Sequence, residues 1–265
     1  MRDLEGKVAI VTGASGGIGK ATALALAQAG MHVALAARRA EALQAVAAQI
    51  EALGRQALVV PTDVTVREQV EALVARTLAH FGRLDVVVAN AGYYFRSPIR
   101  DLTLETLERS LAVNFYGGVY LVLAALPHLL TQNSGQIVLV TSMDGKKGLP
   151  PDAPYVAAKF ALSGFGDVLR QELHGTGVGA TVVFPGRVDT PMIDNLQVPW
   201  ISAKIPPEKV GRAIVKAIQK NQAEVIVPFQ ARLLYWAQCW APRLADWAVR
   251  VFHLAGWETH SPSQG

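Results

Sequence analysis

The sequence predicts an α/β fold in which a doubly wound parallel β-sheet is flanked by helices within a single domain. Three observations predict it. Short apolar runs alternate with longer segments of helical period, no Ser/Gly/Pro-rich linker separates two differently patterned halves, and 51% of the 265 residues are hydrophobic. Parallel strands that are covered by helices on both faces are continuously apolar, as these runs are. The length and the apolar content allow a sizeable core and exclude disorder over most of the chain.

The apolar runs and helical segments follow one another in regular βα order. The strand-like runs are 7–13, 32–37, 56–64, 84–92, 136–142 and 179–186. The helical segments are 19–30, 41–54, 67–82, 103–130, 153–174 and a stretch that starts near residue 207. Right-handed crossovers would wind this sheet in both directions from its first strand. A ligand crevice is then expected at the carboxyl ends of the strands.

A glycine-rich loop lies between the first strand and the first helix. It reads Thr12-Gly13-Ala14-Ser15-Gly16-Gly17-Ile18-Gly19. Bare backbone there allows close approach to a pyrophosphate, whose charge free N–H groups and the helix dipole would stabilise. A glycine-rich turn alone is often only a turn, but this position after a strand and before a helix favours dinucleotide binding.

The end of the second strand bears on which dinucleotide binds. An acidic residue there would hydrogen-bond the free 2′-hydroxyl of NAD. This chain has Ala37 followed by Arg38 and Arg39, and a guanidinium suits a 2′-phosphate by its charge and its fork of donors. We therefore expect NADP, bound as NADPH through Arg38, with NAD as the less favoured alternative. For Arg39, contact with the cofactor and an ordinary solvated position at the start of a helix are equally good explanations.

Three residues form a candidate catalytic group. Tyr155 and Lys159 are four residues apart in a helical stretch, so their side chains share a face, and Ser142 ends the preceding strand. A free tyrosine has a pKa of about 10 and is a poor base at neutral pH, whereas a nearby ammonium favours its phenolate. A single Tyr-Lys pair of this spacing would suit an ordinary amphipathic helix. Its combination with the serine and the glycine loop favours catalysis.

With its TGxxxGxG loop, its YxxxK pair and the upstream serine, the chain resembles the short-chain dehydrogenase/reductase family over about residues 4–228. The resemblance implies a Rossmann-like fold and hydride transfer between nicotinamide and a carbonyl or secondary alcohol. It also implies that Tyr155 exchanges a proton with the substrate oxygen and that Ser142 holds this oxygen. Lys159 would bind the nicotinamide ribose, and Asn114 would support a water-linked proton relay.

The resemblance extends the cofactor site beyond the glycine loop. The aspartate after the third strand would meet the adenine, an NAG turn follows the fourth strand, and a PGxVxT-type segment would meet the nicotinamide amide or the pyrophosphate. The implied contacts are Asp63, Val64, Asn90, Ala91, Gly92, Pro185, Gly186, Val188 and Thr190, in addition to Tyr155 and Lys159. Each of these segments has the alternative of being a simple turn. We assign no metal site.

Segment 191–206 is a proline-punctuated stretch that in this family forms a mobile lid over the substrate. Several apolar side chains there and after the NAG turn suggest an apolar pocket, with packing or subunit contact as the alternative. They are Met192, Ile193, Leu196, Trp200, Tyr93, Tyr94 and Phe95. We expect a small carbonyl or alcohol substrate that is apolar. Family members are commonly homo-dimers or homo-tetramers.

The pattern divides the chain into a dinucleotide-binding and catalytic part, 1–228, and an amphipathic helical extension, 229–265. The extension carries two apolar stripes. They are Phe229, Leu233, Trp236 and Trp240, and then Leu244, Trp247, Val251 and Leu254. Packing on the same subunit or on a partner is favoured, and peripheral membrane contact through 229–256 is the alternative. We expect Cys239 to be a small buried hydrophobe.

Composition limits the remaining possibilities. The lone cysteine cannot form an internal disulfide, and the first residues lack the pattern of a signal peptide, so we expect a cytoplasmic protein, with peripheral membrane attachment as an open alternative. The net charge of +4 is spread along the chain rather than gathered in a block, which argues against nucleic-acid binding. A dinucleotide-binding sensor or scaffold recruited by its tail is the alternative function. The intact Ser142, Tyr155 and Lys159 argue against it.

Overall fold

A seven-stranded parallel sheet forms the centre of the computed structural model, which describes residues 3–258. The strand order is β3-β2-β1-β4-β5-β6-β8, so the sheet is wound in both directions from β1. The strands are β1 (Val8–Thr12), β2 (His32–Ala37), β3 (Ala57–Pro61), β4 (Val86–Ala89), β5 (Gly135–Val140), β6 (Val178–Pro185) and β8 (Glu224–Val227). The predicted fold class is confirmed. The short strand β8 is an addition to the six predicted runs.

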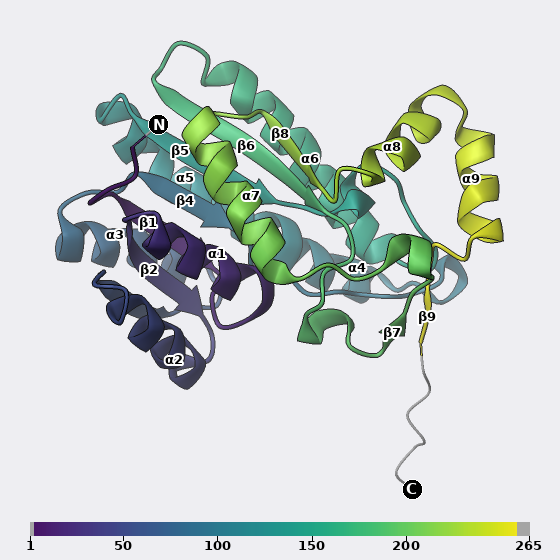
Figure 1. Ribbon diagram of the computed structural model, residues 1–265, viewed down its shortest axis with the longest axis horizontal. Coiled ribbons are helices and arrows are strands. Elements are labelled where there is room, and N and C mark those ends of the chain that lie inside the picture. The colour runs from purple at the N-terminus through teal and green to yellow at the C-terminus, as the bar shows by residue number, and fades with distance from the viewer. Residues whose placement is uncertain (1–2, 259–265) are drawn as a thin grey trace, which may run out of the picture.

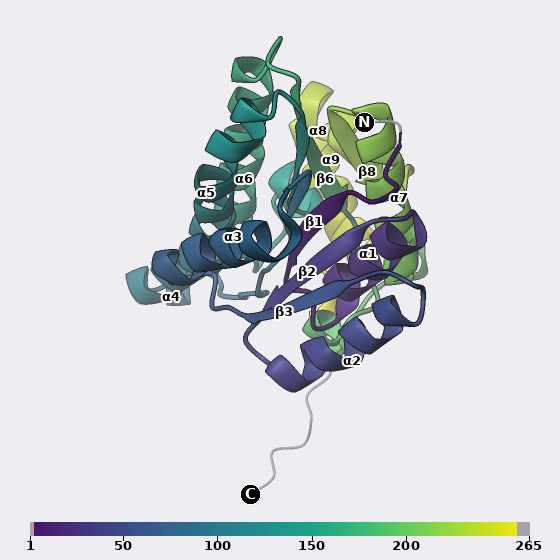
Figure 2. The same cartoon turned by 90° about the vertical axis from the view of Figure 1, so that its left-hand side faces the viewer.

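Two layers of helices cover the sheet (Figure 2). One layer consists of α1 (Gly17–Gln28), α2 (Ala40–Glu51) and α7 (Pro207–Lys220). The other consists of α3 (Arg67–Phe81), α4 (Leu104–Leu111), α5 (Gly117–Thr131) and α6 (Ala153–Glu172). Short 3-10 turns are formed by Ile99–Asp101, Met143–Gly145, Pro191–Ile193 and Trp200–Ser202. Every parallel crossover therefore contains at least one helix, as the alternating sequence pattern predicts.

The core has two halves, one on each face of the sheet. Successive residues of β1 alternate between them: Ala9 and Val11 pack beneath α1, α2 and α7, whereas Ile10 packs beneath α3 and α5. Burial of a valine, leucine or isoleucine side chain contributes about 1.5–3 kcal/mol, so these strand positions hold the layers together. The carboxyl ends of β1, β4, β5 and β6 are thereby fixed at one edge of the sheet.

Helices α4 and α5 form one nearly continuous element, joined by a π-helical turn at Ala112–Tyr116. Among the described residues, this element, 104–131, is the one helix long and apolar enough to span a membrane by length and composition. Its buried positions Leu121, Ala125 and Leu129 belong to the core beneath α5, and the helix packs against α3, β4 and β5. The apolar residues of this helix therefore contribute to the core of the fold.

The tail forms a helical hairpin at the carboxyl edge of the sheet (Figure 1). It consists of α8 (Ala231–Trp240) and α9 (Pro242–Val251), and β9 (Trp257–Glu258) then pairs antiparallel with β7 (Leu196–Gln197) of the lid segment. Helices α8 and α9 pack on each other, α8 also contacts β8, and Ala245 and Val249 of α9 are buried.

Two expectations for the tail are wrong within this subunit. The predicted apolar stripes do not pack on it: Leu233, Trp240 and Leu244 are exposed. Helix α9 packs mainly on α8, and the side chains of α9 that are buried are the smaller Ala245 and Val249. Cys239 is exposed rather than buried, because it lies beside Trp240 on the outward side of α8.

Candidate active site

The glycine loop after β1 is folded tightly against the NAG turn after β4. A Cβ atom at Gly19 would lie 2.2 Å from the carbonyl oxygen of Gly13, and one at Gly13 would lie 2.8 Å from the side-chain nitrogen of Asn90. Gly13 also has a positive φ of 67°, which favours glycine. A Cβ atom at Gly16, in contrast, would meet nothing within 4 Å. The loop thus requires glycine for its own packing at two positions and leaves bare backbone facing open space at a third.

Thr12 joins the two strand ends, a role that the sequence analysis missed. Its hydroxyl oxygen accepts hydrogen bonds from the backbone N–H groups of Asn90 and Ala91, at 3.0 and 3.1 Å. The Asn90 side chain in turn donates to the Thr12 carbonyl oxygen at 2.9 Å. The signal was a hydroxyl residue at the end of the first strand. Its partner, 78 residues away in the chain, was not visible in the sequence.

The segment after β6 returns to the glycine loop. Thr190 lies over Gly17, where a Cβ atom would come within 3.0 Å of the Thr190 methyl group. The structure therefore brings together two of the predicted cofactor segments, 12–19 and 185–190. Their individual contacts with a cofactor stay predictions.

The end of β2 carries an exposed Arg38 close to Asp63. Hydrogen bonds from the Thr65 backbone and hydroxyl, at 2.9 and 2.7 Å, hold the pKa of Asp63 below its ordinary value, and the charge of Arg38 acts in the same direction. Asp63 thus shapes the turn before α3 as well as lying at the predicted adenine end. Val64 is buried and packs at Gly117, and Arg39 precedes the first turn of α2 in an exposed position.

Ser142, Tyr155 and Lys159 are all buried at the carboxyl end of β5 and the start of α6. The ammonium of Lys159 donates to the Val140 carbonyl oxygen at 3.1 Å. Burial lowers the pKa of Lys159 to about 8, although the Asp144 carboxylate opposes this shift. The predicted catalytic residues therefore meet, and the lysine is poised near neutral pH.

Tyr155 differs from the expectation that Lys159 lowers its pKa. The ammonium nitrogen lies 5.5 Å from the centre of the tyrosine ring. Burial raises the pKa of Tyr155 above its ordinary value and the charge of Asp144 raises it further, while a hydrogen bond with Ser142 opposes them. Desolvation and the Asp144 charge outweigh the Ser142 hydrogen bond, because the phenolate would be formed in a dry site beside a carboxylate.

Asn114 lies in the π-helical turn between α4 and α5. Its side chain donates to the Tyr93 carbonyl oxygen at 2.9 Å and accepts from the Tyr93 N–H group at 3.1 Å. A Cβ atom at Gly92 would lie 2.7 Å from its oxygen and 3.6 Å from the Lys159 nitrogen. Such turns often occur at functional sites. The structure brings Asn114, Gly92 and Lys159 together, and the role of Asn114 in proton transfer stays a prediction.

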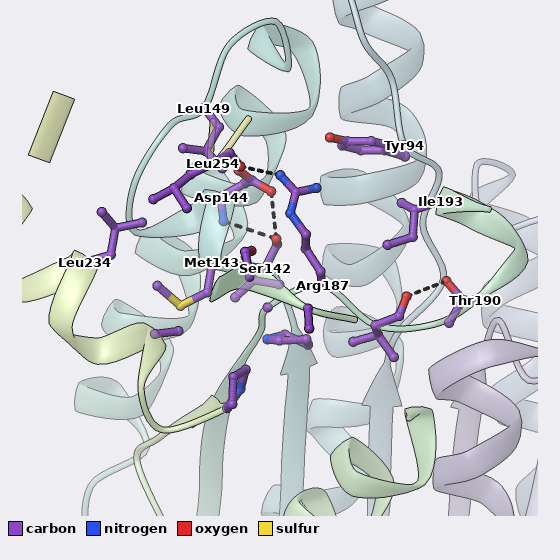
Figure 3. Close-up of a pocket in the computed structure, with 18 of the residues that line it drawn as sticks. Tyr94, Ser142, Met143, Asp144, Leu149, Arg187, Thr190, Ile193, Leu234 and Leu254 are labelled. Carbon is purple, nitrogen blue, oxygen red and sulfur yellow. Dashed lines mark hydrogen bonds between the residues drawn. The ribbon is translucent and has the colours of Figure 1, made fainter. Parts of the chain in front are cut away.

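Asp144 is a site residue that the sequence analysis did not select. Its carboxylate accepts a hydrogen bond from the Ser142 hydroxyl at 3.0 Å, and its N–H group donates to the same hydroxyl oxygen at 3.1 Å (Figure 3). The second carboxylate oxygen is buried and has no hydrogen-bond partner within residues 3–258. Burial raises the pKa of Asp144 to about 7; Asp152 adds to the shift, while Ser142, Arg187 and Lys159 oppose it. The one sequence signal was an acid two residues after the serine.

Tyr94 forms part of the wall next to Tyr155. Its ring meets the Tyr155 ring edge-on, with 5.0 Å between centres. Its hydroxyl donates to Asp152 at 2.5 Å, and Arg96 donates to the other oxygen of the same carboxylate at 3.0 Å. Burial raises the pKa of Tyr94 far above its ordinary value. Tyr94 is therefore a fixed, neutral side chain at the site.

These residues line a cavity of about 370 Å³ with a largely apolar wall. The wall combines the glycine loop, the strand ends, the lid and the tail. Its apolar members include Ile18, Leu149, Met192, Ile193, Ile201, Leu233, Leu234 and Leu254. Of the residues expected to form an apolar pocket, Met192, Ile193 and Tyr94 do so. Leu196 is buried elsewhere, and Trp200 and Tyr93 are exposed, so that part of the prediction is wrong.

Two polar contacts attach the tail to the site. Arg187, in the cavity wall, donates to the Leu254 carbonyl oxygen (Figure 3). Lys147, in the loop after Ser142, forms an ion pair with Asp246 of α9. The tail is therefore part of the cavity rather than a separate appendage. Within residues 3–258, no three His, Cys, Asp or Glu side chains gather in a group that could hold a metal ion.

Comparisons with known proteins agree with this geometry. Residues 7–198 match the family model described as short chain dehydrogenase. An uncharacterized oxidoreductase of Staphylococcus epidermidis is 36% identical over 218 residues, which cover 82% of this chain and 93% of the relative. A short-chain type dehydrogenase/reductase from Mycobacterium marinum superimposes with a TM-score of 0.79 at 29% identity, covering 85% of this chain and 95% of that one. For an alcohol dehydrogenase from Thermococcus sibiricus complexed with 5-hydroxy-NADP, the TM-score is 0.76 at 30% identity, with coverages of 84% and 96%.

Proposed function

The chain belongs to the short-chain dehydrogenase/reductase family, and we propose that it is an NADP-dependent enzyme that acts on a carbonyl or secondary alcohol of an apolar small molecule. The oxidoreductase class follows from the family, while the cofactor form and the substrate are the proposed part. The observation that carries the proposal is the joint burial of Ser142, Tyr155 and Lys159 at a cavity with a largely apolar wall. A protein that only binds a dinucleotide has no need of that arrangement.

The glycine loop fits a dinucleotide. The open backbone at Gly16 and the close packing of Gly13 and Gly19 form a cradle at the start of α1, where N–H groups and the helix dipole favour a pyrophosphate. Arg38 is exposed at the adenosine end, next to a strand that ends without a carboxylate, which supports a 2′-phosphate. When bound, the nicotinamide supplies the hydride donor or acceptor. Thr190, over Gly17, and the backbone of 186–188 would hold its amide end.

The protein's own residues would handle the proton. Because burial and Asp144 raise the pKa of Tyr155, this phenol keeps its proton at neutral pH and suits donation to the alkoxide that forms during carbonyl reduction. Lys159, with a pKa of about 8, and Asn114 would resupply that proton. In the oxidation direction the phenol must first lose its proton. We therefore propose that carbonyl reduction is favoured at neutral pH.

Asp144 would act as a positioning residue for Ser142. As a carboxylate, it accepts a hydrogen bond from the Ser142 hydroxyl, so this hydrogen is not available to the substrate oxygen. As a neutral acid, it can donate a hydrogen bond to the Ser142 oxygen, which frees the serine hydrogen for the substrate oxygen. Its buried second oxygen has no partner in the described structure, which makes the charged form costly and favours the neutral one. The neutral form is thus the one suited to carbonyl reduction.

An apolar substrate is supported by the cavity. Its volume of about 370 Å³ lies within the range of small-molecule sites, which is about 300–1,000 Å³. Leucine, isoleucine and methionine side chains from the lid and the tail dominate the wall away from Tyr155. The alternative of a dinucleotide sensor or scaffold has no comparison in its favour. It would require tight NADPH binding without turnover of any carbonyl compound.

We further propose a homo-oligomer, a dimer or tetramer, in the cytoplasm. Exposed apolar side chains on α5 and α6 support it: Leu123, Phe160 and Val168 are exposed, and a subunit interface would bury them. Light scattering should give a mass of at least twice 28.4 kDa. Leu123→Glu should yield monomers, and a monomeric wild-type protein would rule the interface out.

The experiment that tests the main proposal is a calorimetric titration with NADPH and with NADH, followed by a screen of aliphatic and aromatic ketones and aldehydes. We expect NADPH to bind more tightly and to be oxidised by apolar carbonyl compounds. Equal affinity for the two cofactors would refute the NADP preference. Binding without turnover across the screen would favour the sensor instead.

A further inference from the structure

All five tryptophans of the chain lie in the lid and the tail, and none is in the core. Their exposed fractions are 88% for Trp200, 49% for Trp236, 87% for Trp240, 50% for Trp247 and 51% for Trp257. Tryptophan is highly buried on average in soluble proteins, so five exposed ones in a folded chain call for an explanation. Figure 1 places α8, α9, β7 and β9 at one end of the molecule, beyond the carboxyl edge of the sheet.

The tail helices turn their large apolar residues away from the protein. On α8, Leu233, Trp236 and Trp240 are spaced three and four residues apart, so they share one exposed face. On α9, Leu244, Trp247 and Val251 repeat the same spacing and are also exposed. We call these six residues the aromatic face. The buried residues of α9 are Ala245 and Val249, so the aromatic face is exposed and available for another surface.

Positive charge accompanies the aromatic face. Each arginine of the tail is about one helical turn from a tryptophan. Arg232 precedes Trp236 by four residues, and Arg243 and Arg250 lie four before and three after Trp247. The described part of the tail has two carboxylates, Asp246 and Glu258, and Asp246 pairs with Lys147 and lies near Arg250. Arg232 and Arg243 form no ion pair within residues 3–258, so the tail surface combines indole rings with guanidinium groups that keep their positive charge.

We propose that the aromatic face docks on the surface of an anionic phospholipid bilayer. Tryptophan is favoured at the boundary between headgroups and acyl chains, and arginine can keep its charge among lipid phosphates while its stem lies along apolar surface. A helix with this division of residues lies in the plane of the interface. A second copy of the chain fits less well, because a two-fold pairing of this face would oppose like charges.

Docking would also place the cavity mouth against the lipid. Leu233 belongs both to the aromatic face and to the cavity wall, and Ile201, next to the exposed Trp200, lines the same cavity. The contacts Arg187–Leu254 and Lys147–Asp246 hold the tail on the catalytic loops. An apolar carbonyl compound dissolved in the bilayer could then enter without crossing water. This consequence rests on the proposed function, whereas the docking itself does not.

The test is sedimentation of the full-length protein with sucrose-loaded vesicles of phosphatidylcholine, with and without 30% phosphatidylserine. We expect binding to the anionic vesicles, at least tenfold weaker binding to the neutral ones, and a blue shift of tryptophan emission on binding. The double variant Trp236→Ser/Trp240→Ser should lose at least tenfold in vesicle affinity. Leu53→Ser, which removes an exposed leucine just after α2, far from the tail and from the proposed subunit interface, serves as the control and should keep wild-type vesicle binding.

Three results would overturn the proposal: no binding of the wild-type protein to anionic vesicles, equal binding by the double variant, or tryptophan-dependent self-association without vesicle binding. Circular dichroism and NADPH affinity check that the double variant is folded, since neither tryptophan lines the cavity. Failure of the proposed function has a different outcome. A protein that binds vesicles but neither binds NADPH nor reduces carbonyl compounds would keep the docking surface and lose the enzymatic assignment.

Discussion

The two ends of the crevice are built in different ways. At the nucleotide end the surface is largely backbone: glycines of the loop after β1 pack on the NAG turn after β4, and Arg38 and Asp63 add charge. At the substrate end the surface is made of side chains from remote segments, such as Tyr94, Ser142 and Leu254. The nucleotide end therefore depends on one short loop and the strand ends next to it. The substrate end depends on side chains from segments that are distant in the chain.

The residue at which the two ends meet should show the largest effect. Tyr155→Phe removes the phenol proton, and turnover should fall by about 10²–10⁴-fold, while NADPH affinity stays within about twofold because no cofactor charge is touched. Turnover is measured by NADPH absorbance and affinity by calorimetry. A variant that keeps half of the activity would contradict the proton-transfer role.

Substitutions at two glycines of one loop should distinguish a loss of folding stability from a loss of cofactor affinity. Gly19→Ala places a Cβ atom against the Gly13 carbonyl oxygen, and the cost of overpacking of about 1–3 kcal/mol should lower the Tm by several degrees. Gly16→Ala meets open space in the free protein, so its Tm should change little, but NADPH should bind about tenfold more weakly, a loss of about 1.4 kcal/mol. Differential scanning fluorimetry measures the Tm, and calorimetry measures the NADPH affinity. Equal Tm values for the two variants would refute the assigned packing.

The charge at the nucleotide end should set cofactor choice. Arg38→Ala removes hydrogen bonds to a charged group that are worth about 1.5–3 kcal/mol, so NADPH affinity should fall about 10–100-fold while NADH affinity is unchanged. Arg39→Ala is the matched control and should change either affinity less. If both cofactors lose affinity equally in Arg38→Ala, the 2′-phosphate contact is ruled out.

The charge of Asp144 at the substrate end should set the pH dependence of turnover, and we expect this effect to be smaller than the effect of Arg38→Ala. The folded pKa of Asp144, about 7, lies above its ordinary value of 3.8. Its protonation therefore stabilises the folded protein at low pH, and this contribution is lost as pH rises through about 7. The rate of carbonyl reduction by the wild type should fall several-fold from pH 6 to pH 8, because the Asp144 carboxylate then accepts the hydrogen bond that Ser142 would otherwise donate to the substrate oxygen.

Asp144→Asn should flatten that pH profile, because an amide can donate to Ser142 at every pH. The Tm of the variant should also rise relative to the wild type between pH 5 and pH 8, a measurement that needs no substrate. A pH profile of unchanged shape, with a constant Tm difference, would show that Asp144 does not titrate in this range.

Local pattern was sufficient for most of the fold. The strands β1–β6 are apolar runs bounded by turns, and both core faces of β1 follow from its alternation. Strand β8 was missed because it has four residues and begins with Glu224, which gives a weak pattern. The tail helices were predicted from their apolar stripes, but the prediction that these stripes pack on the same subunit was wrong: Leu233, Trp240 and Leu244 are exposed, whereas Ala245 and Val249 are buried. Which side of an amphipathic helix is covered depends on neighbours that the local pattern does not specify.

The sequence by itself determined the order of strands and helices, the glycine loop, and the residues Ser142, Tyr155 and Lys159, because each depends on spacing along one βα unit or one helix face. Tertiary structure alone decided that Thr12 joins two strand ends, that Asp144 accepts a hydrogen bond from Ser142 at a cavity with a largely apolar wall, and that the tail forms part of this wall while its tryptophans are exposed. The physical reason is that burial, and the pKa shifts it causes, depend on neighbours that are distant in the chain.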